Sequence, residues 1–169
     1  HRLRWHYRSK SSSLIRFSNF HIYNQKLQIF PSPGEQVDSN LGVYLHQVDG
    51  EYKSGTNAEE AKTMVDAILQ FMTDSRDRSL GVVLLNKKQA ELVEEELEAV
   101  RMTDQRIDRY VDEWASRNGG LESFFIKNLE NVQGDERDVI FIGTVYGPAN
   151  VGGRVAQRFG PISGQNGRR

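Results

Sequence analysis

A polar connector lies between two of the most apolar stretches of this 169-residue chain. The connector is Gln133–Glu136, which supplies an amide, a glycine and two carboxylates, and the flanking apolar runs are 124–126 and 139–142. Amide and carboxylate groups at the mouth of a sheet can bind a ligand, and α/β folds place their ligands there. Gly134 permits a backbone conformation or a close approach that a side chain would forbid. A solvated acidic turn between two core strands is the alternative interpretation.

Four carboxylates in and around the connector, Glu130, Asp135, Glu136 and Asp138, are in principle enough to hold Mg²⁺. They crowd on one loop without a matching lysine on a neighbouring strand, so we rank a metal-dependent nuclease last and predict no metal site. The four histidines have no partners at metal-ligand spacing. The absence of cysteine excludes disulfides and Cys-ligated zinc, and it is compatible with a reducing cytoplasm, where we expect the protein to act.

The elements that must position the connector alternate between strands and helices. Three short, continuously apolar runs, Leu80–Leu85, Phe124–Ile126 and Val139–Val145, predict central strands buried on both faces of a sheet. Apolar residues at helical spacing predict helices over 57–72, 88–100 and 104–114. This alternation implies βαβ units, so we predict an α/β fold with a mostly parallel sheet and helices on both faces.

The amino-terminal third has a weaker pattern. Serines at 11–13 offer N-caps for a helix that begins near Leu14, and the partly alternating run Leu41–Val48 predicts a strand. The length predicts a single domain over 1–169, with a flexible segment over 148–169 where periodicity is lost. No stretch approaches 18 consecutive apolar residues, so no transmembrane helix is expected.

The net charge of −1 gives no general attraction to nucleic acid. Positive charge is instead concentrated in two segments, 2–16 and 154–169. These arginines and lysines either line one binding surface or form ordinary solvated ends. The sequence also contains no G-x-x-x-x-G-K-[ST], so a phosphate-binding loop of its own is excluded.

Three segments, in order along the chain, resemble motifs of the superfamily-one helicases. The opening LRWHYRSKSSSLIRFSN resembles the (H/Q/N)-Y-R-S/M segment, and GVVLLNKKQAELVEEELE resembles the strand and helix of motif IV. The stretch ENVQGDERDVIFI resembles motif V, in which a Q-G-x-E-x-D loop connects two strands. The resemblance is to the second RecA-like domain of these enzymes, closest to the RNA-decay and DNA-processing branch. It implies a RecA-like fold of the P-loop NTPase type without its own phosphate loop.

The resemblance implies roles in nucleotide binding for five residues. Arg8 would be catalytic and reach the γ-phosphate of ATP, because a guanidinium stabilises charge developing on the transferred group. Tyr7 would stack near the base, and Glu136 would accept hydrogen bonds from the ribose hydroxyls. Gln133 and Gly134 would shape the loop that carries Glu136. A surface salt bridge is the alternative interpretation of Arg8.

The motif IV and motif V matches also imply contacts to single-stranded nucleic acid. Asn86 and Gln89 lie on the first match and Asn128 begins the second, so these three are candidates for positioning the strand or a loop. The chain departs from the family at 84–86, where Leu-Leu-Asn replaces the usual Thr-Pro-Tyr. Side-chain contacts are therefore less secure here than backbone contacts.

The expected partners follow from the same resemblance. They are single-stranded DNA or RNA and a first RecA-like domain of the same parent chain, which would hold most of ATP and Mg²⁺. We expect the chain to be a fragment that stops before motif VI, which would carry a second catalytic arginine, and to be inactive alone. A non-catalytic α/β domain that binds nucleic acid or protein is the alternative.

Overall fold

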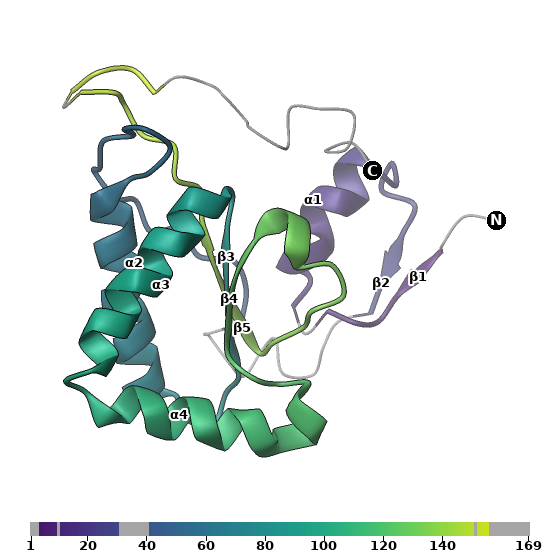
Figure 1. Cartoon of the computed structure of the whole chain (residues 1–169). Coiled ribbons are helices and arrows are strands. Elements are labelled where there is room, and N and C mark those ends of the chain that lie inside the picture. Colours follow the sequence, from purple (N-terminus) through teal and green to yellow (C-terminus); the bar gives the residue numbers. More distant parts are fainter. Residues whose placement is uncertain (1–3, 10, 31–40, 151, 156–169) are drawn as a thin grey trace. The chain divides into compact units, whose positions relative to one another are not determined.

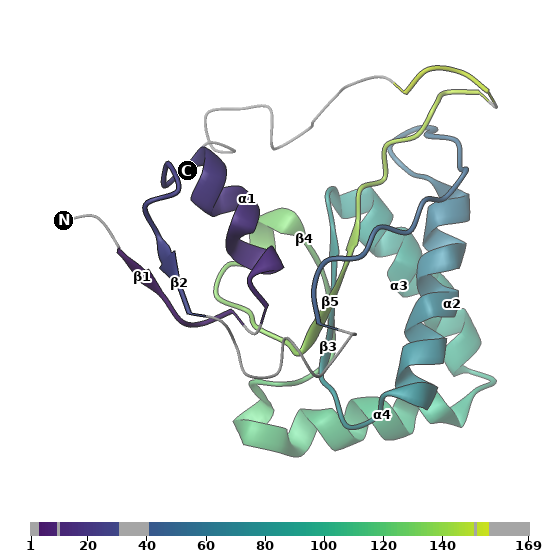
Figure 2. The same ribbon diagram turned by 180° about the vertical axis from the view of Figure 1, so that it is seen from behind.

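The computed structural model describes residues 4–9, 11–30, 41–150 and 152–155. Internal contacts divide the chain into two compact units, His1–Gln47 and Val48–Arg169, which we call the first and second units (Figures 1 and 2). Each unit is described by itself. The prediction of one functional domain stays a prediction, and most of the segment expected to be flexible, 148–169, lies outside the described residues.

The first unit contains one helix and a pair of very short strands. Strands β1 (Trp5–His6) and β2 (Gln28–Ile29) pair in parallel, and helix α1 (Ser13–His21) connects them. The helix predicted after the serines is therefore confirmed. Asn19 of α1 donates to the Leu27 carbonyl and accepts from the Leu27 amide, both at 3.1 Å. This pair of hydrogen bonds fixes the helix beside the start of β2.

The second unit is built on a three-stranded parallel sheet in the order β4-β3-β5. Strand β3 (Leu80–Leu84) lies in the centre and every one of its residues is buried. Strands β4 (Phe125–Asn128) and β5 (Val139–Gly143) pair with it on either side. The three predicted strands and their parallel arrangement are confirmed, with small differences at their ends. The prediction that all three are central is wrong, because among the described strands only β3 has a neighbour on both sides.

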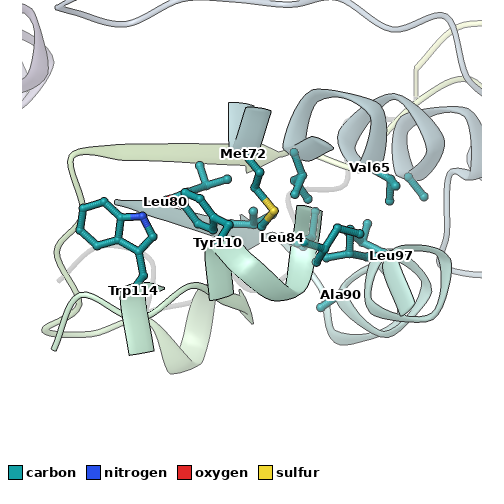
Figure 3. Close-up of a cluster of buried hydrophobic side chains, with 13 residues drawn as sticks. Val65, Met72, Leu80, Leu84, Ala90, Leu97, Tyr110 and Trp114 are labelled. Atoms are coloured by element: carbon teal, nitrogen blue, oxygen red, sulfur yellow. The ribbon is translucent and has the colours of Figure 1, made fainter. Parts of the chain in front are cut away.

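Three helices pack against one face of this sheet and against one another (Figures 1 and 3). They are α2 (Ala58–Asp74), α3 (Lys87–Arg101) and α4 (Gln105–Ser116). Each begins at a residue whose side chain accepts a backbone N–H, namely Asn57, Asn86 and Asp104. Alternate residues of β3 pack into their apolar core, which is lined by Val65, Met72, Leu80, Leu84, Ala90, Leu97, Tyr110 and Trp114 (Figure 3). Short 3₁₀ turns, η2 (Arg117–Gly120) and η3 (Leu129–Asn131), flank β4.

The opposite face of the sheet differs from the prediction. Val139 and Phe141 of β5 pack on the helices, whereas Ile140 is 39% and Ile142 63% exposed. The expectation that β5 is buried on both faces is wrong, because the helices of the second unit cover only one face. Over β3 this face is covered by Phe125, whose ring occupies the space above Gly81.

The prediction of a strand over Leu41–Val48 is also wrong. This segment has no regular secondary structure, and Val43, Tyr44 and Leu45 are all more than two-thirds exposed. A run of strand-forming residues becomes a strand only when a neighbouring backbone pairs with it. None of the described strands pairs with this segment. No helix in the described part of the chain is long and apolar enough to cross a membrane.

Candidate functional site

The carboxyl ends of the three parallel strands meet at one edge of the sheet, which we call the carboxyl edge. Leu84 of β3 is in register with both Asn128 of β4 and Gly143 of β5. Helices α2 and α3 begin at the same edge, since the side chain of Asn57 donates to the carbonyl of Val145 just beyond β5, and α3 directly follows β3. Helix N-termini carry partial positive charge, which favours anions.

Asn86 occupies the N-cap of α3 with both ends of its amide engaged. Its Oδ1 accepts from the backbone N–H of Gln89 at 2.8 Å, and its Nδ2 donates to the Gly55 carbonyl at 3.0 Å. The side chain therefore joins the start of α3 to the turn that precedes α2. It lies at the carboxyl edge and is partly exposed.

Gln89 lies at the same edge but is fully buried. Its Oε1 accepts from the Asn57 amide and its Nε2 donates to the Asn57 carbonyl, both at 2.8 Å. The side chain thus holds both backbone polar groups of Asn57 at the start of α2. Two roles were predicted for Gln89, positioning a loop and positioning single-stranded nucleic acid. This geometry agrees better with positioning a loop.

The carboxylate of Glu60 is a functional candidate that the sequence interpretation missed. Both of its oxygens accept from the backbone N–H of Val145, at 3.0 and 2.9 Å, and one accepts from Gln89 Nε2 at 3.2 Å. Burial raises the pKa of Glu60, and the hydrogen bonds from Val145, Thr144 and Gln89 oppose that effect. A buried carboxylate whose pKa is set by opposing effects is typical of functional sites as well as of structural networks.

A sequence signal for Glu60 does exist. Asn57 and Glu60 have the N-cap and N3 spacing of a capping box, in which the N3 side chain accepts from the N-cap amide. Here the Asn57 amide donates to Gln89 instead, while the Asn57 side chain still accepts from the Glu60 amide at 3.1 Å. The carboxylate of Glu60 is thereby released to bind Val145, which is 85 residues away. That long-range exchange could not be inferred from the spacing.

Asn128, the third amide predicted to position nucleic acid or a loop, lies at this edge as the last residue of β4. Its Oδ1 is the one buried side-chain polar atom for which the described residues provide no hydrogen-bond partner. A buried acceptor without a donor is costly and calls for an explanation, such as a ligand, a water molecule or a shift of the loop. Asn86, just after β3, and Asn128, at the end of β4, thus lie at one edge of the sheet, and their predicted contacts with nucleic acid stay a prediction.

The connector Gln133–Glu136 does not stay at the carboxyl edge as predicted. It begins after η3, and Asp135 pairs with Lys127 of β4 at 2.6 Å. The next residues reach the opposite edge, where Arg137 donates to the Ser123 carbonyl and Asp138 accepts from Ser79. The correction has a topological reason: β5 runs parallel to β4 and no helix connects them, so the connector itself must return along the sheet.

Within the connector, Gly134 has a φ of +92°, as its predicted role in permitting an unusual backbone requires. Gln133 and Glu136 are exposed, so both are accessible to a ligand. Among the described residues no three carboxylate or histidine side chains gather as metal ligands would. Asp135 and Asp138 in particular point to different partners, Lys127 and Ser79.

Tyr7 and Arg8 belong to the first unit and follow β1. His6 Nε2 accepts from the Ser9 amide at 3.2 Å and lies 2.7 Å from the Ser9 hydroxyl. These contacts close a tight turn around the two residues between them. Tyr7 is 84% exposed and Arg8 is also exposed, so both side chains of the turn are accessible to solvent.

These features define a parallel α/β domain with a polar carboxyl edge and no phosphate loop of its own. A family model described as AAA domain, AAA_12, matches residues 1–157, and the chain belongs to this family. The match agrees with the RecA-like α/β fold class predicted from the sequence, which is therefore confirmed.

Two curated relatives are similar to the chain at 37% identity over 169 residues. They are an uncharacterized ATP-dependent helicase of Mycoplasma genitalium and its homologue in Mycoplasma pneumoniae. The alignments cover 98% of this chain and 14% of each relative, so the chain spans about one-seventh of their length.

Proposed function

We propose that the chain is the second RecA-like domain of a superfamily-one helicase, of the RNA-decay and DNA-processing branch. In this proposal it contributes one wall of an ATP site and part of a track for single-stranded DNA or RNA. Membership of the AAA domain family and similarity to proteins named ATP-dependent helicases support this function. We further propose that the parent protein acts in the cytoplasm.

The observation that carries the proposal is the arrangement of the carboxyl edge. Asn86, just after β3, and Asn128, the last residue of β4, lie there next to the N-termini of α2 and α3. Exposed lysines 87 and 88 lie in the first turn of α3. Amide groups, helix N-termini and lysines are the groups that hold the sugar–phosphate backbone of a single strand. Gln89 supports this surface from within by clamping Asn57.

The ATP role rests on Tyr7, Arg8 and the connector. Exposed side chains of Tyr7 and Arg8 would take the base and the γ-phosphate, and Glu136 would take the ribose, with Gln133 and Gly134 shaping its loop. A first RecA-like domain of the parent would hold Mg²⁺ and most of the phosphate contacts, because this chain has no phosphate loop. Hydrolysis needs all of these groups, so the 169-residue chain alone should show no ATPase or unwinding activity.

The decisive experiment replaces Arg8 in a protein that contains this chain together with its first RecA-like domain. Arg8→Ala should lower ATP turnover by about 10³-fold or more, as loss of an arginine finger does, while leaving single-strand affinity nearly unchanged. Phosphate release and oligonucleotide anisotropy measure the two quantities. Arg4→Ala, which removes another exposed arginine four residues earlier, is the matched control. Full turnover in Arg8→Ala would favour the alternative, a non-catalytic domain that binds nucleic acid or protein.

A further inference from the structure

The bend that follows β5 contains a strained residue. Val145 has a φ of +70° and is completely buried. A β-branched residue in the left-handed region is a genuine outlier, because its side chain collides with its own backbone there. Such strain persists only where surrounding contacts impose it, and it gathers at functional sites. Two features of the bend therefore matter: the contacts that hold Val145 in this conformation, and the residue whose side chain the bend positions.

Glu60 imposes the bend. Its two oxygens accept from the Val145 amide, which fixes the direction of that N–H against the preference of the residue. The Asn57 side chain donates to the Val145 carbonyl at 3.3 Å, so both backbone polar groups of Val145 are held by the start of α2. Gln89 holds Asn57 and Glu60 in turn. Three buried or half-buried polar side chains thus serve to orient one peptide segment.

The bend determines where the side chain of the next residue, Tyr146, lies. The next residues return toward the loop before α2, where the Tyr52 amide donates to the Pro148 carbonyl at 2.9 Å. This brings the Tyr52 and Tyr146 rings to 5.4 Å between centroids with an interplanar angle of 51°. Both rings are partly exposed. Two aromatic rings of the same sheet edge are therefore held together next to the N-termini of α2 and α3.

We propose that Tyr146, supported by Tyr52, is a stacking platform for a base of single-stranded nucleic acid, and that Glu60 is the positioning residue that sets it. This inference rests on the proposed function, and it adds a base-contacting subsite to a track otherwise made of backbone-contacting groups. An aromatic face accepts any base, so the platform binds without sequence preference. The nearby helix N-termini supply positive charge for the adjacent phosphates, and so does Lys88, whose ammonium donates to the Ser54 carbonyl two residues after Tyr52.

The test measures binding of the full 169-residue chain to a short fluorescein-labelled oligothymidylate at low salt, by fluorescence anisotropy. A second oligonucleotide has the same sugar–phosphate backbone but abasic sites in place of bases. Tyr146→Ala should weaken binding of the first by about tenfold, as loss of one base stack does, and leave the second unchanged. Tyr146→Phe, which keeps the aromatic face, should bind like the wild type.

Glu60→Gln tests the positioning role. An amide in this place turns an N–H toward backbone donors, so the Val145 bend should relax and binding to the base-bearing strand should fall to the level of Tyr146→Ala. The double variant should lose no more than either single variant, because both remove the same contact. Glu59→Gln, the exposed neighbour on the same helix turn, is the matched control and should bind normally.

The outcomes separate the two proposals. If neither oligonucleotide binds the wild-type chain, the nucleic-acid track of the proposed function is overturned together with the platform. If both bind but Tyr146→Ala has no effect, or weakens the abasic strand equally, the platform alone is overturned. Additive losses in the double variant would overturn the positioning role of Glu60 and leave the platform in place.

Discussion

The two edges of the sheet in the second unit are built in different ways. At the amino edge, Ser79 donates to Asp138 at 2.9 Å and accepts from the Asp138 amide at the same distance. Close by, the Tyr110 hydroxyl donates to the Arg78 carbonyl at 2.7 Å. None of the residues 76–79 and 136–139 has a positive φ. The amino edge is thus closed by hydrogen bonds between residues whose backbone is unstrained.

At the carboxyl edge, by contrast, a half-buried carboxylate holds a strained valine, and the amide oxygen of Asn128 has no partner in the described part of the chain. The backbone is also crowded: a Cβ on Gly147 would lie 2.2 Å from the Gly50 carbonyl oxygen. Strain and desolvation reduce stability, and they are retained where a site needs a defined geometry. The contrast indicates that one edge stabilises the domain and that the other is shaped for binding.

The largest expected effect on stability comes from substituting Tyr110, whose hydroxyl group bonds at the amino edge. Tyr110→Ala should lower the free energy of unfolding by about 3–5 kcal/mol, since it removes a fully buried aromatic side chain from the core. Tyr110→Phe should cost about 1 kcal/mol, because the Arg78 carbonyl loses its donor. Urea unfolding measures both changes. Oligonucleotide affinity of Tyr110→Phe should equal that of the wild type, and a loss comparable to that in Tyr146→Ala would break the distinction between the edges.

A smaller effect on stability is expected at the carboxyl edge. Gly147→Ala should lower the free energy of unfolding by about 1–3 kcal/mol, because the new methyl group meets backbone rather than a movable side chain. It should also weaken oligothymidylate binding, since the crowded segments carry Tyr52 and Tyr146. Gly134→Ala is the comparison, because the new methyl group meets no atom within 4 Å. The φ of +92° at this position should then lower the free energy of unfolding by roughly 1 kcal/mol only. Normal binding by Gly147→Ala would show that this crowding has no functional role.

The stabilising parts of the fold could be predicted from the sequence, because their signals are local. Asn57 and the apolar spacing after it define α2, and the continuous run at Leu80–Leu84 defines the buried central strand. Exposure of Ile142 could not be predicted, since a continuous apolar run does not say how many faces are covered. The strand expected over 41–48 failed for a related reason, because pairing depends on a partner that the segment itself does not specify.

The candidate site was predictable only in part. Asn86 and Asn128 were named as candidates from their motif matches alone. The structure has Asn128 as the last residue of β4 and Asn86 two residues after β3, and their contact with nucleic acid stays a prediction. The path of Gln133–Glu136 was missed, since it depends on the strand order β4-β3-β5, which the sequence does not state. Glu60 and Val145 were missed because they are 85 residues apart, and their contact exists only after Gln89 has taken the Asn57 amide.

The smallest expected effect is a pH dependence of the free energy of unfolding. It decides whether the buried groups of the carboxyl edge reduce the stability of the domain. Burial raises the pKa of Glu60 above its usual 4.5, so the folded chain holds this proton more tightly than the unfolded chain. The stability that Glu60 contributes is therefore fully present below pH 4.5 and is lost as the pH rises through its raised pKa in the folded state. Glu60→Gln removes this titration.

Urea unfolding at a series of pH values, from below 4.5 to neutral, measures the effect for the wild type, Glu60→Gln and the exposed control Glu59→Gln. The free energy of unfolding of the wild type minus that of Glu60→Gln should decrease as the pH rises, while Glu59→Gln should follow the wild type. A difference that increases with pH would mean that the hydrogen bonds from Val145 and Thr144 outweigh desolvation. Ionised Glu60 would then stabilise the fold, and the carboxyl edge would be built for stability as the amino edge is.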